Sequence, residues 1–272
     1  MVGGGFQHDI CSSALNANKY VEWVKDGSAD ISIHIDNSIH QVPTDNGKLC
    51  FGWLAESSSI IPSVVEWVLK HPDFFKQYYK HIFTHDKRII KMDPSFFKFA
   101  PPNCLPWIKN KEIYPKSKNI SFIVSNKNWT DGHKFRLSVL EKYKSYVDHY
   151  GAGFQTNLPW SITYNNIEES GKFVALKDYR FSFCFENDNY PSIFCEKLTD
   201  CFATGTIPIF WGTPDIGEYF DKDGIIMYDE NFDISMLTED FYNKKMDAIR
   251  NNFNFAVDLI SSEDYIYKNY IE

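Results

Sequence analysis

The chain has 272 residues, of which 43% are hydrophobic and 17% aromatic, and its formal net charge at pH 7 is −8. This length and apolar content are typical of one or two globular domains with a sizeable core. The acidic balance argues against a general nucleic-acid-binding protein, and no apolar run approaches the roughly 20 residues that a membrane-spanning helix requires.

The start of the chain and its cysteines indicate the compartment. The first ten residues, MVGGGFQHDI, lack the basic start and the apolar core of a secretory signal peptide. The six cysteines are scattered, and none forms a CxxC motif. Buried, reduced thiols are therefore expected, and the sequence predicts a soluble, cytoplasmic protein without a membrane anchor.

The N-terminal part of the chain is predicted to mix strands and one helix. Residues 31–35 alternate like a strand, residues 49–56 form an apolar strand that ends at polar residues, and residues 78–86 contain a short strand. Residues 63–71 carry valines and a tryptophan at helical spacing after a proline, which is a helix-start signal.

A proline-rich stretch then divides the sequence. Residues 101–115 contain four prolines, each of which fixes φ and removes a backbone donor, so regular structure is not expected there. We interpret this stretch as an interdomain linker, and a long loop packed on one domain is the alternative. The predicted division is an N-terminal domain over residues 1–115, linker included, and a C-terminal domain over residues 116–272 that ends in helices.

After the linker, strands and helices alternate. The sequence predicts strands at 119–126, 146–151, 180–187, 206–212 and 224–228, helices at 132–146 and 191–205, a short helix or turn at 173–179, and helices from residue 235 onward. Alternating strands and helices are typical of a doubly wound parallel sheet. The predicted fold class is therefore α/β.

Two loops of this sheet are candidates for a ligand site. Ligands of doubly wound sheets bind beside the carboxyl ends of the strands, where helices begin. One such loop leads into the helix that carries Arg136, and another leads into the helix that carries Glu196 and Lys197. A helix N-terminus with an arginine and a lysine suits a diphosphate. From the residues alone, a solvated ion pair of Glu196 and Lys197 is the alternative.

A longer segment resembles a known family. The stretch from "FSFCFEN" to "CEKLTDCFATGTIPIFWG" is similar to the C-terminal signature of the family 10 glycosyltransferases, the α-1,3/α-1,4-fucosyltransferases. Upstream, "FIVSNK…KFR" resembles a strand of that family followed by a helix with an arginine, and "FGWLAES" resembles its N-terminal acidic segment. Without an anchor, the chain is most similar to the soluble microbial or viral members.

The resemblance implies a fold, a reaction and residue roles. The implied fold is GT-B, two Rossmann-like domains facing across a cleft, with a small N-terminal domain. The implied reaction moves L-fucose from GDP-fucose to a glycan hydroxyl with inversion. By motif, Arg136 and Lys197 would hold the diphosphate, Glu196 would bind hydroxyls of the ribose or fucose, Asn187 would line the donor pocket, and Glu56 would be the general base.

Two further donor-binding residues follow from the same motifs. Asn126 ends the strand segment "FIVSN", and Tyr190 lies in the loop before the Glu-Lys pair. An aromatic residue often precedes that pair in the family, and both Tyr190 and Phe194 are candidates for it. The family's threonine before the pair is Cys195 here, but the pair itself is present.

The expected partners are a GDP-sugar donor and a glycan acceptor, with no nucleic acid. No cofactor and no metal are predicted, because a leaving diphosphate needs only charge stabilisation. The acidic triplet at 221–223 is interpreted as a solvated turn rather than a metal site. Two alternatives stay open: a transferase of the same family that uses another GDP-deoxysugar, and a protein of this fold that binds nucleotides or carbohydrates without catalysis.

Overall fold

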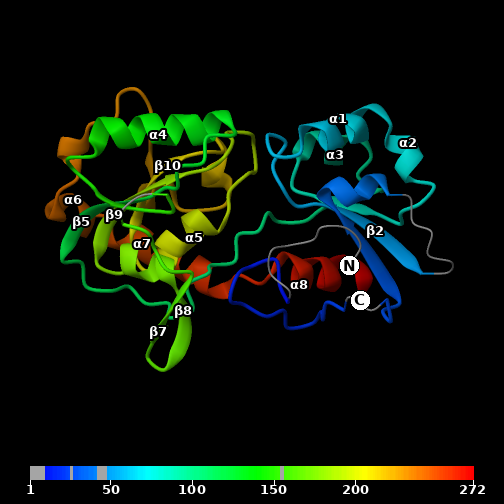
Figure 1. The fold of residues 1–272 in the computed structure, drawn as a ribbon, viewed down its shortest axis with the longest axis horizontal. Coiled ribbons are helices and arrows are strands. Elements are labelled where there is room, and N and C mark those ends of the chain that lie inside the picture. Colours follow the sequence, from blue (N-terminus) through cyan, green and yellow to red (C-terminus); the bar gives the residue numbers. More distant parts are fainter. Residues whose placement is uncertain (1–9, 25–26, 42–47, 154–155) are drawn as a thin grey trace. The chain divides into compact units, whose positions relative to one another are not determined.

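The computed structural model describes residues 10–24, 27–41, 48–153 and 156–272, and the chain forms two compact units (Figure 1). Unit 1 comprises Met1–Asn103, Pro191–Ile193 and Ile260–Glu272, and unit 2 comprises Cys104–Tyr190 and Phe194–Leu259. Each unit contains its own parallel sheet, with four strands in unit 1 and five in unit 2. The prediction of two Rossmann-like α/β domains, the N-terminal one smaller, is confirmed.

Unit 1 is built around the sheet β1-β2-β3-β4, in which every neighbouring pair is parallel. Its strands are β1 (Ile31–Ile35), β2 (Leu49–Leu54), β3 (Ile82–Thr84) and β4 (Phe97–Phe99). Its helices are η1 (Asp36–His40), α1 (Pro62–Lys70), α2 (Pro72–Phe75), α3 (Lys87–Met92), α8 (Ser262–Ile266) and η6 (Tyr267–Ile271). The predicted strands at 31–35, 49–56 and 78–86 and the helix at 63–71 are all present.

The last segment, Ile260–Glu272, belongs to unit 1, which corrects the predicted extent of the C-terminal domain to residue 272. The helices between residues 239 and 258 lie in unit 2, as predicted. Ile266 of α8 is buried in the same cluster as Phe51, Trp53 and Phe83, which share one face of the sheet. The Glu263 carboxylate accepts hydrogen bonds from the backbone N–H and the hydroxyl of Ser12, both at 2.6 Å. An apolar sheet face needs a cover, and here the last 13 residues supply it.

The boundary between the units falls at residues 103 and 104. The rest of the proline-rich stretch packs on unit 2, as the alternative of a loop packed on one domain predicts, and is not a linker. Ile108 is fully buried in a core cluster of that unit, and the backbone N–H groups of Lys109 and Asn110 donate to the buried Glu169 carboxylate. Side-chain acceptors replace the ladder bonds that prolines prevent, so the stretch is ordered without regular structure.

Unit 2 is built around the sheet β11-β10-β9-β5-β6, again parallel throughout, and carries a separate antiparallel hairpin. Its strands are β5 (Lys118–Ile123), β6 (Asp148–Tyr150), β7 (Ser161–Tyr164), β8 (Ile167–Ser170), β9 (Tyr179–Phe185), β10 (Ile207–Trp211) and β11 (Ile226–Met227). Its helices are α4 (Asp131–Tyr143), η2 (Gly171–Ala175), α5 (Glu196–Ala203), η3 (Ile216–Glu218), η4 (Lys222–Gly224), η5 (Ile234–Met236), α6 (Glu239–Asn243) and α7 (Met246–Asp258).

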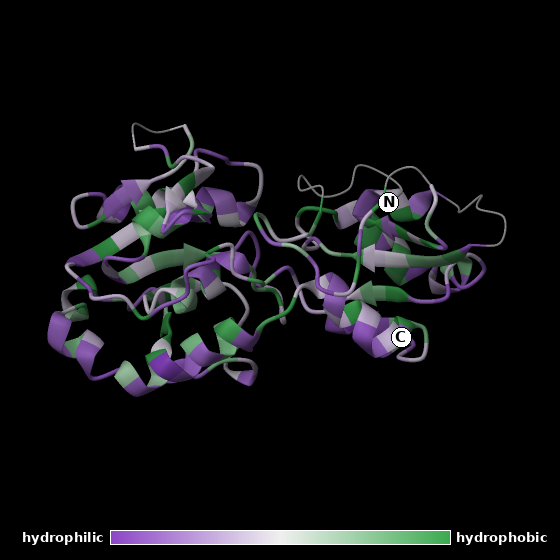
Figure 2. Ribbon diagram, turned by 90° about the horizontal axis from the view of Figure 1, so that it is seen from below, coloured by the Kyte–Doolittle hydropathy of each residue, from purple (hydrophilic) through white to green (hydrophobic). Residues whose placement is uncertain are grey.

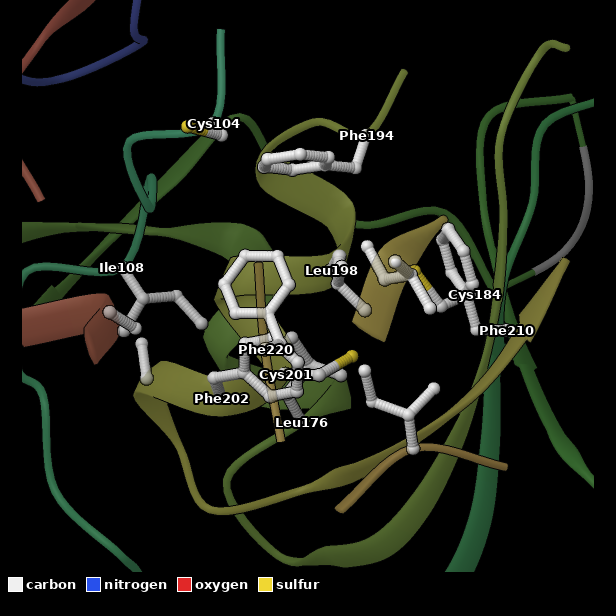
Figure 3. Close-up of a cluster of buried hydrophobic side chains, with 14 of the residues drawn as sticks. Cys104, Ile108, Leu176, Cys184, Phe194, Leu198, Cys201, Phe202, Phe210 and Phe220 are labelled. Carbon is white, nitrogen blue, oxygen red and sulfur yellow. The ribbon is translucent and has the colours of Figure 1, made fainter. Parts of the chain in front are cut away.

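Strand β9 explains why this sheet is buried on both faces. Successive side chains of a strand point to opposite faces. Phe181, Phe183 and Phe185 accordingly pack in the cluster with α4, whereas Cys184 packs in the cluster with α5, which Figure 3 shows around Leu198 and Phe202. In Figure 2 the strands are largely hydrophobic and the helices mix both kinds of residue, as expected for helices that cover a central sheet.

One predicted helix begins later than expected. The proline at 191 suggests a helix start there, but α5 begins at Glu196 with Cys195 as its N-cap. Ser192 has a φ of 67°, a left-handed conformation that cannot continue into an α-helix. The loop after β9 is therefore longer than predicted, and the Glu-Lys pair lies at the first two helical positions.

The strand order places a topological switch point between β5 and β9. The chain leaves β5 to form β6 on one side, and β9 then pairs with β5 on the other side. The loops that follow β5 and β9 therefore diverge at the carboxyl edge of the sheet, which leaves room for a ligand between them. The fold thus predicts a site formed by these loops and by the first turns of α4 and α5.

Candidate active site

A pocket of about 550 Å³ occupies the switch point of unit 2. All the residues that line it belong to unit 2. They come from β5 and β9 and the loops that follow them, from the loop after β6, from α4 and α5, from residues 170–176, and from the proline-rich stretch, which contributes Trp107. This volume lies within the range of small-molecule sites. The sequence-based placement of a ligand site at these two loops therefore coincides with a pocket in the structure.

One part of the pocket is cationic. Arg136 of α4 and Lys197 of α5 both line it. Arg136 is 6% exposed, and its Nε has no hydrogen-bond partner among the described residues. Lys197 donates to the buried carboxylate of Glu186, with an Nζ–Oε2 distance of 3.1 Å. The second oxygen of Glu186 accepts the backbone N–H of Cys195 at 2.9 Å.

The electrostatics keep both cations charged. Burial disfavours the ammonium of Lys197, but the surrounding negative groups, Glu186 among them, outweigh burial and raise the pKa of Lys197. Burial lowers the pKa of Arg136, while Glu186 opposes that effect, and a guanidinium stays charged in either case. Glu186 thus forms an ion pair with Lys197 and favours the charged form of Arg136, and both cations line one pocket, where they can share an anion.

The first turn of α4 packs directly against the loop after β9. Thr130 caps the helix through its hydroxyl, which accepts the backbone N–H of His133 at 3.1 Å. Gly132 lies so close to the loop that a Cβ atom there would be 2.5 Å from the carbonyl oxygen of Asn187. Only a residue without a side chain permits this approach, which brings Asn187 to the pocket wall.

His133 also lines the pocket, but as a neutral group. Its Nδ1 lies 2.8 Å from the Thr130 hydroxyl. Burial and the positive charge of Arg136 lower its pKa to about 4. At neutral pH, therefore, His133 adds no charge to the site.

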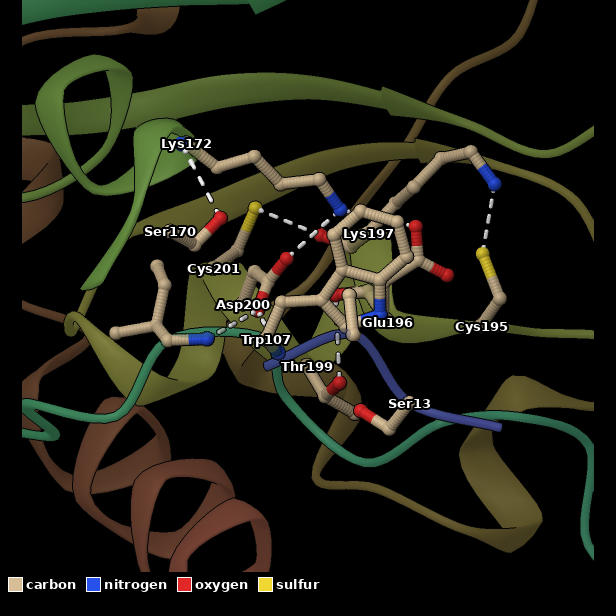
Figure 4. A network of polar contacts seen from close by, with 12 residues as sticks. Ser13, Trp107, Ser170, Lys172, Cys195, Glu196, Lys197, Thr199, Asp200 and Cys201 are labelled. Carbon is tan, nitrogen blue, oxygen red and sulfur yellow. Dashed lines mark hydrogen bonds and ion pairs between the residues drawn. The ribbon is translucent and has the colours of Figure 1, made fainter. Parts of the chain in front are cut away.

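Another part of the pocket holds a compact ionic cluster (Figure 4). Lys172 of η2 lies 2.9 Å from Glu196 Oε1 and 2.9 Å from Asp200 Oδ2. The same ammonium lies 4.0 Å from the centre of the Trp107 ring. Burial raises the pKa of Glu196, but Lys172 and Lys197 outweigh it and lower that pKa to about 2. Glu196 is therefore an ionised acceptor in the pocket.

Four of the predicted site residues meet in this pocket: Arg136, Asn187, Glu196 and Lys197 all line it. Asn126 and Tyr190 are not among its lining residues. Asn126 lies between two residues that are, Ser125 and Lys127, and its side chain packs against Gly153. Tyr190 is 42% exposed in the loop after β9.

The candidate general base belongs to unit 1. Glu56 is exposed and follows β2 at the carboxyl edge of the sheet. Its backbone N–H donates to the Asp36 carboxylate at 3.2 Å, and the N–H of Ala55 donates to the same oxygen at 2.8 Å. Asp36 follows the neighbouring strand β1 and has a φ of 49°. Two carboxylates thus lie at the ends of adjacent parallel strands, where sites in α/β domains form.

Three functional candidates have no role in the sequence-based prediction: Glu186, Lys172 and Asp200. Glu186 had a signal, because it is a charged residue at the end of an apolar strand and is part of the "FEN" triplet. Its burial to 2% exposure shows that it faces inward. Lys172 had none, since only the tertiary structure brings it to α5.

No group of three or more histidine, cysteine or acidic side chains in the described ranges is arranged to hold a metal ion. The acidic triplet at 221–223 forms a short turn. Its first residue, Asp221, accepts the backbone N–H of Asp223 at 3.0 Å and the side-chain amide of Asn251 at 2.8 Å. This agrees with its interpretation as a turn.

The fold and the pocket define unit 2 as a Rossmann-like α/β domain with a cationic ligand pocket. The sequence profile of "Glycosyltransferase family 10 (fucosyltransferase) C-term" matches residues 113–266, which is more than half of the chain. The chain therefore belongs to glycosyltransferase family 10. The family resemblance found in the sequence is confirmed.

Individual relatives are distant. Alpha-(1,3)-fucosyltransferase FucT of Helicobacter pylori is 25% identical over 186 residues, which cover 66% of this chain and 36% of that protein. Alpha-(1,3)-fucosyltransferase B of Drosophila melanogaster is 25% identical over 143 residues, which cover 51% of this chain and 32% of that protein. The match thus spans about a third of the length of these curated relatives.

Solved structures to which the chain is similar include an α1,3-fucosyltransferase, with a TM-score of 0.47 and 14% identity over 85% of this chain and 70% of that one. A structure of an α1,3-fucosyltransferase with GDP-fucose has a TM-score of 0.45 and 14% identity over 88% of this chain and 83% of that one.

Within the described ranges, every helix is too short or too polar to cross a bilayer.

Proposed function

We propose that the protein transfers L-fucose from GDP-fucose to a hydroxyl group of a glycan, with inversion at the anomeric carbon. The observation that carries the proposal is the pocket of unit 2, in which Arg136 and Lys197 accompany an ionised Glu196. Two cations suit a diphosphate and a carboxylate suits sugar hydroxyls. The curated relatives are named α-(1,3)-fucosyltransferases, which supports fucose as the sugar.

The buried guanidinium gives the proposal its physical basis. A buried donor without a partner is costly, and Arg136 Nε is such a donor among the described residues. A phosphate oxygen of a bound nucleotide would satisfy it. The charge of Lys197 is balanced by Glu186 before binding, so the site is preorganised and little reorganisation accompanies the arrival of the diphosphate.

In the proposed reaction, the acceptor oxygen forms a bond to the anomeric carbon while the bond from that carbon to the diphosphate oxygen breaks. The acceptor hydroxyl loses its proton to Glu56, which acts as general base. The electron pair of the broken bond leaves on GDP, whose charge Arg136 and Lys197 stabilise. Asn187 lines the donor pocket, and Asn126 and Tyr190 are proposed to contact the donor. No metal is required in this scheme, and the proposed location is the cytoplasm.

Calorimetric titration tests the donor. GDP-fucose, GDP, GDP-mannose and UDP-galactose are titrated into the protein, and the expected order places GDP-fucose first and UDP-galactose last. Equal affinity for all GDP compounds would refute fucose as the preferred donor sugar and would favour another GDP-sugar as the donor. Absence of nucleotide binding would refute the donor site. If the protein binds the donor but neither transfers nor hydrolyses it, and if Glu56→Gln leaves donor binding unchanged, the protein is a binding protein rather than an enzyme.

A further inference from the structure

The ionic cluster around Lys172 has an arrangement that helix physics alone does not favour. Glu196 and Asp200 are four positions apart on α5, so their side chains lie on the same face of the helix. Two carboxylates at this spacing repel each other, and both are largely buried, with side-chain exposures of 15% and 0%. Lys172, which comes from η2 before β9, supplies the cation between them at 2.9 Å from each.

The two carboxylates differ in how they are held. Asp200 accepts the backbone N–H groups of Trp107 at 2.7 Å and Ile108 at 3.2 Å in addition to Lys172. It is therefore fixed from two sides and fully buried. Glu196 lies at the first helical position with 15% of its side chain exposed, and it lines the pocket. Asp200 thus anchors the ammonium, and the ammonium in turn fixes Glu196.

Trp107 closes the cluster. Its ring lies 4.0 Å from the Lys172 ammonium and 5.5 Å from the ring of Trp160, and both tryptophans line the pocket. A cation over an indole ring is attracted to it, and the ring keeps water from that side of the ammonium. The position of Nζ is therefore determined by three groups: a ring, a buried carboxylate and Glu196, as Figure 4 shows.

A gain in the stability of the fold does not explain why the chain has such a buried ionic cluster. Buried ion pairs and triads are often replaceable by apolar residues without loss of stability, because desolvation offsets the attraction. A carboxylate has about four acceptor positions, and Lys172 is bound at one oxygen of Glu196. The positions that face the pocket can accept two neighbouring hydroxyl groups, provided that the carboxylate stays ionised and does not rotate.

We propose that Lys172 is a positioning residue for the donor: through Asp200 it holds the Glu196 carboxylate so that Glu196 accepts hydrogen bonds from the ribose hydroxyls of a nucleoside diphosphate. This inference rests on the proposed function, since it requires a nucleotide in the pocket. The family resemblance implies that Glu196 binds hydroxyls of either the ribose or the fucose, and this inference selects the ribose. It also adds Lys172, which contacts no ligand in this scheme.

The test compares GDP with 2′,3′-dideoxy-GDP by calorimetry, because the two differ only in the ribose hydroxyls. Wild-type protein is expected to prefer GDP by about tenfold or more, the equivalent of one charge-assisted hydrogen bond. The decisive variant is Lys172→Met/Asp200→Asn. It removes one positive and one negative charge, so that the cluster keeps its net charge and Glu196 keeps no like-charged neighbour.

In this variant the preference for GDP is expected to fall to within about threefold, whereas the affinity for 2′,3′-dideoxy-GDP stays within about threefold of wild type. Lys172→Arg is expected to retain most of the preference, because it keeps the charge. Lys244→Met is the control, since that lysine is 71% exposed and forms an ion pair with Asp240, four positions before it. Circular dichroism and the thermal midpoint verify that each variant is folded.

A folded double variant that keeps the wild-type preference would overturn the positioning role of Lys172. Equal affinity of the wild-type protein for GDP and 2′,3′-dideoxy-GDP would overturn the ribose role of Glu196 while leaving the donor site intact. If the wild-type protein binds neither compound, both the inference and the proposed function are refuted. The failure of one is thus distinguishable from the failure of the other.

Discussion

Replacing Lys197 by Met tests whether the cation beside Glu186 binds the donor or only balances a buried charge. In the structure, Lys197 Nζ lies 3.1 Å from Glu186 Oε2 and 2.7 Å from the sulfur of Cys195. The Lys197 side chain is 29% exposed and that of Glu186 is 3% exposed. The ammonium therefore has a buried partner on one side and the pocket on the other.

Two effects of known size follow. A charge-assisted hydrogen bond to a phosphate contributes about 1.5–3 kcal/mol, so its loss lowers GDP affinity by about 10- to 150-fold. Removing one partner of a fully buried ion pair costs about 3–5 kcal/mol of stability. Because Lys197 is partly exposed, we expect a smaller loss, on the order of 1–3 kcal/mol. Lys197→Met is expected to show both losses.

A second variant separates the two effects. Lys197→Met/Glu186→Gln removes the uncompensated carboxylate, while the glutamine can still accept the backbone N–H of Cys195 that Glu186 accepts at 2.9 Å. Stability is expected to recover, measured as the thermal midpoint, whereas GDP affinity is expected to stay at least about tenfold below wild type. Lys244→Met again serves as the exposed control.

The reasoning would be refuted by either of two results. GDP affinity of Lys197→Met within about threefold of wild type would mean that the ammonium does not contact the diphosphate. Full recovery of both stability and affinity in the double variant would mean that Lys197 acts on the donor only through the fold. Calorimetry at two salt concentrations adds a check, because a lost phosphate contact reduces the salt dependence of binding.

Three further predictions follow from the structure. Gly132→Ala places a Cβ 2.5 Å from the carbonyl oxygen of Asn187, so it is expected to lower both the thermal midpoint and GDP affinity. The exposed substitution Ser138→Ala on the same helix should change neither, and an unaltered Gly132→Ala protein would contradict the close packing. Burial raises the pKa of Asp36 from 3.8 to about 7, so the folded chain retains a proton that the unfolded chain releases above about pH 4. The stability of unit 1 therefore falls as the pH rises toward about 7. Asp36→Asn removes this dependence, and the thermal midpoint of the variant relative to wild type is expected to be higher at about pH 8 than at about pH 5; a constant difference would show that Asp36 does not titrate in this window. Glu56→Gln is expected to leave the affinity for GDP-fucose unchanged and to lower transfer or donor hydrolysis by at least about 100-fold; retained turnover would exclude Glu56 as the base.

One element was missed although the sequence carries its signal. Strands β7 and β8 form a hairpin in which Tyr164 pairs with Ile167. The two residues between them, Asn165 and Asn166, have φ values of 49° and 62°. Two adjacent residues with positive φ form the turn that matches the twist of a hairpin, and asparagine tolerates that conformation well. The Asn-Asn pair between alternating residues therefore predicts this hairpin from local chemistry.

The sequence by itself determined the parts that depend on neighbouring residues. Apolar runs define β5, β9 and β10, and the alternation of strands with helices determines the parallel sheet, because burial on both faces requires such runs. The ends of these strands identify the loops of the pocket. Arg136, Glu196 and Lys197 were found on the helices that follow these loops, and Asn187 was found through the family resemblance. These inferences need no knowledge of distant contacts.

The tertiary structure alone decided the parts that depend on residues far apart in the chain. Lys172 reaches Glu196 across 24 positions, and Ser12 reaches Glu263 across 251 positions. No local period or motif records such a pair, because only the folded arrangement of the chain brings the two residues together. The partner of Glu196, the buried orientation of Glu186 and the return of the C-terminal segment to unit 1 were therefore beyond sequence patterns.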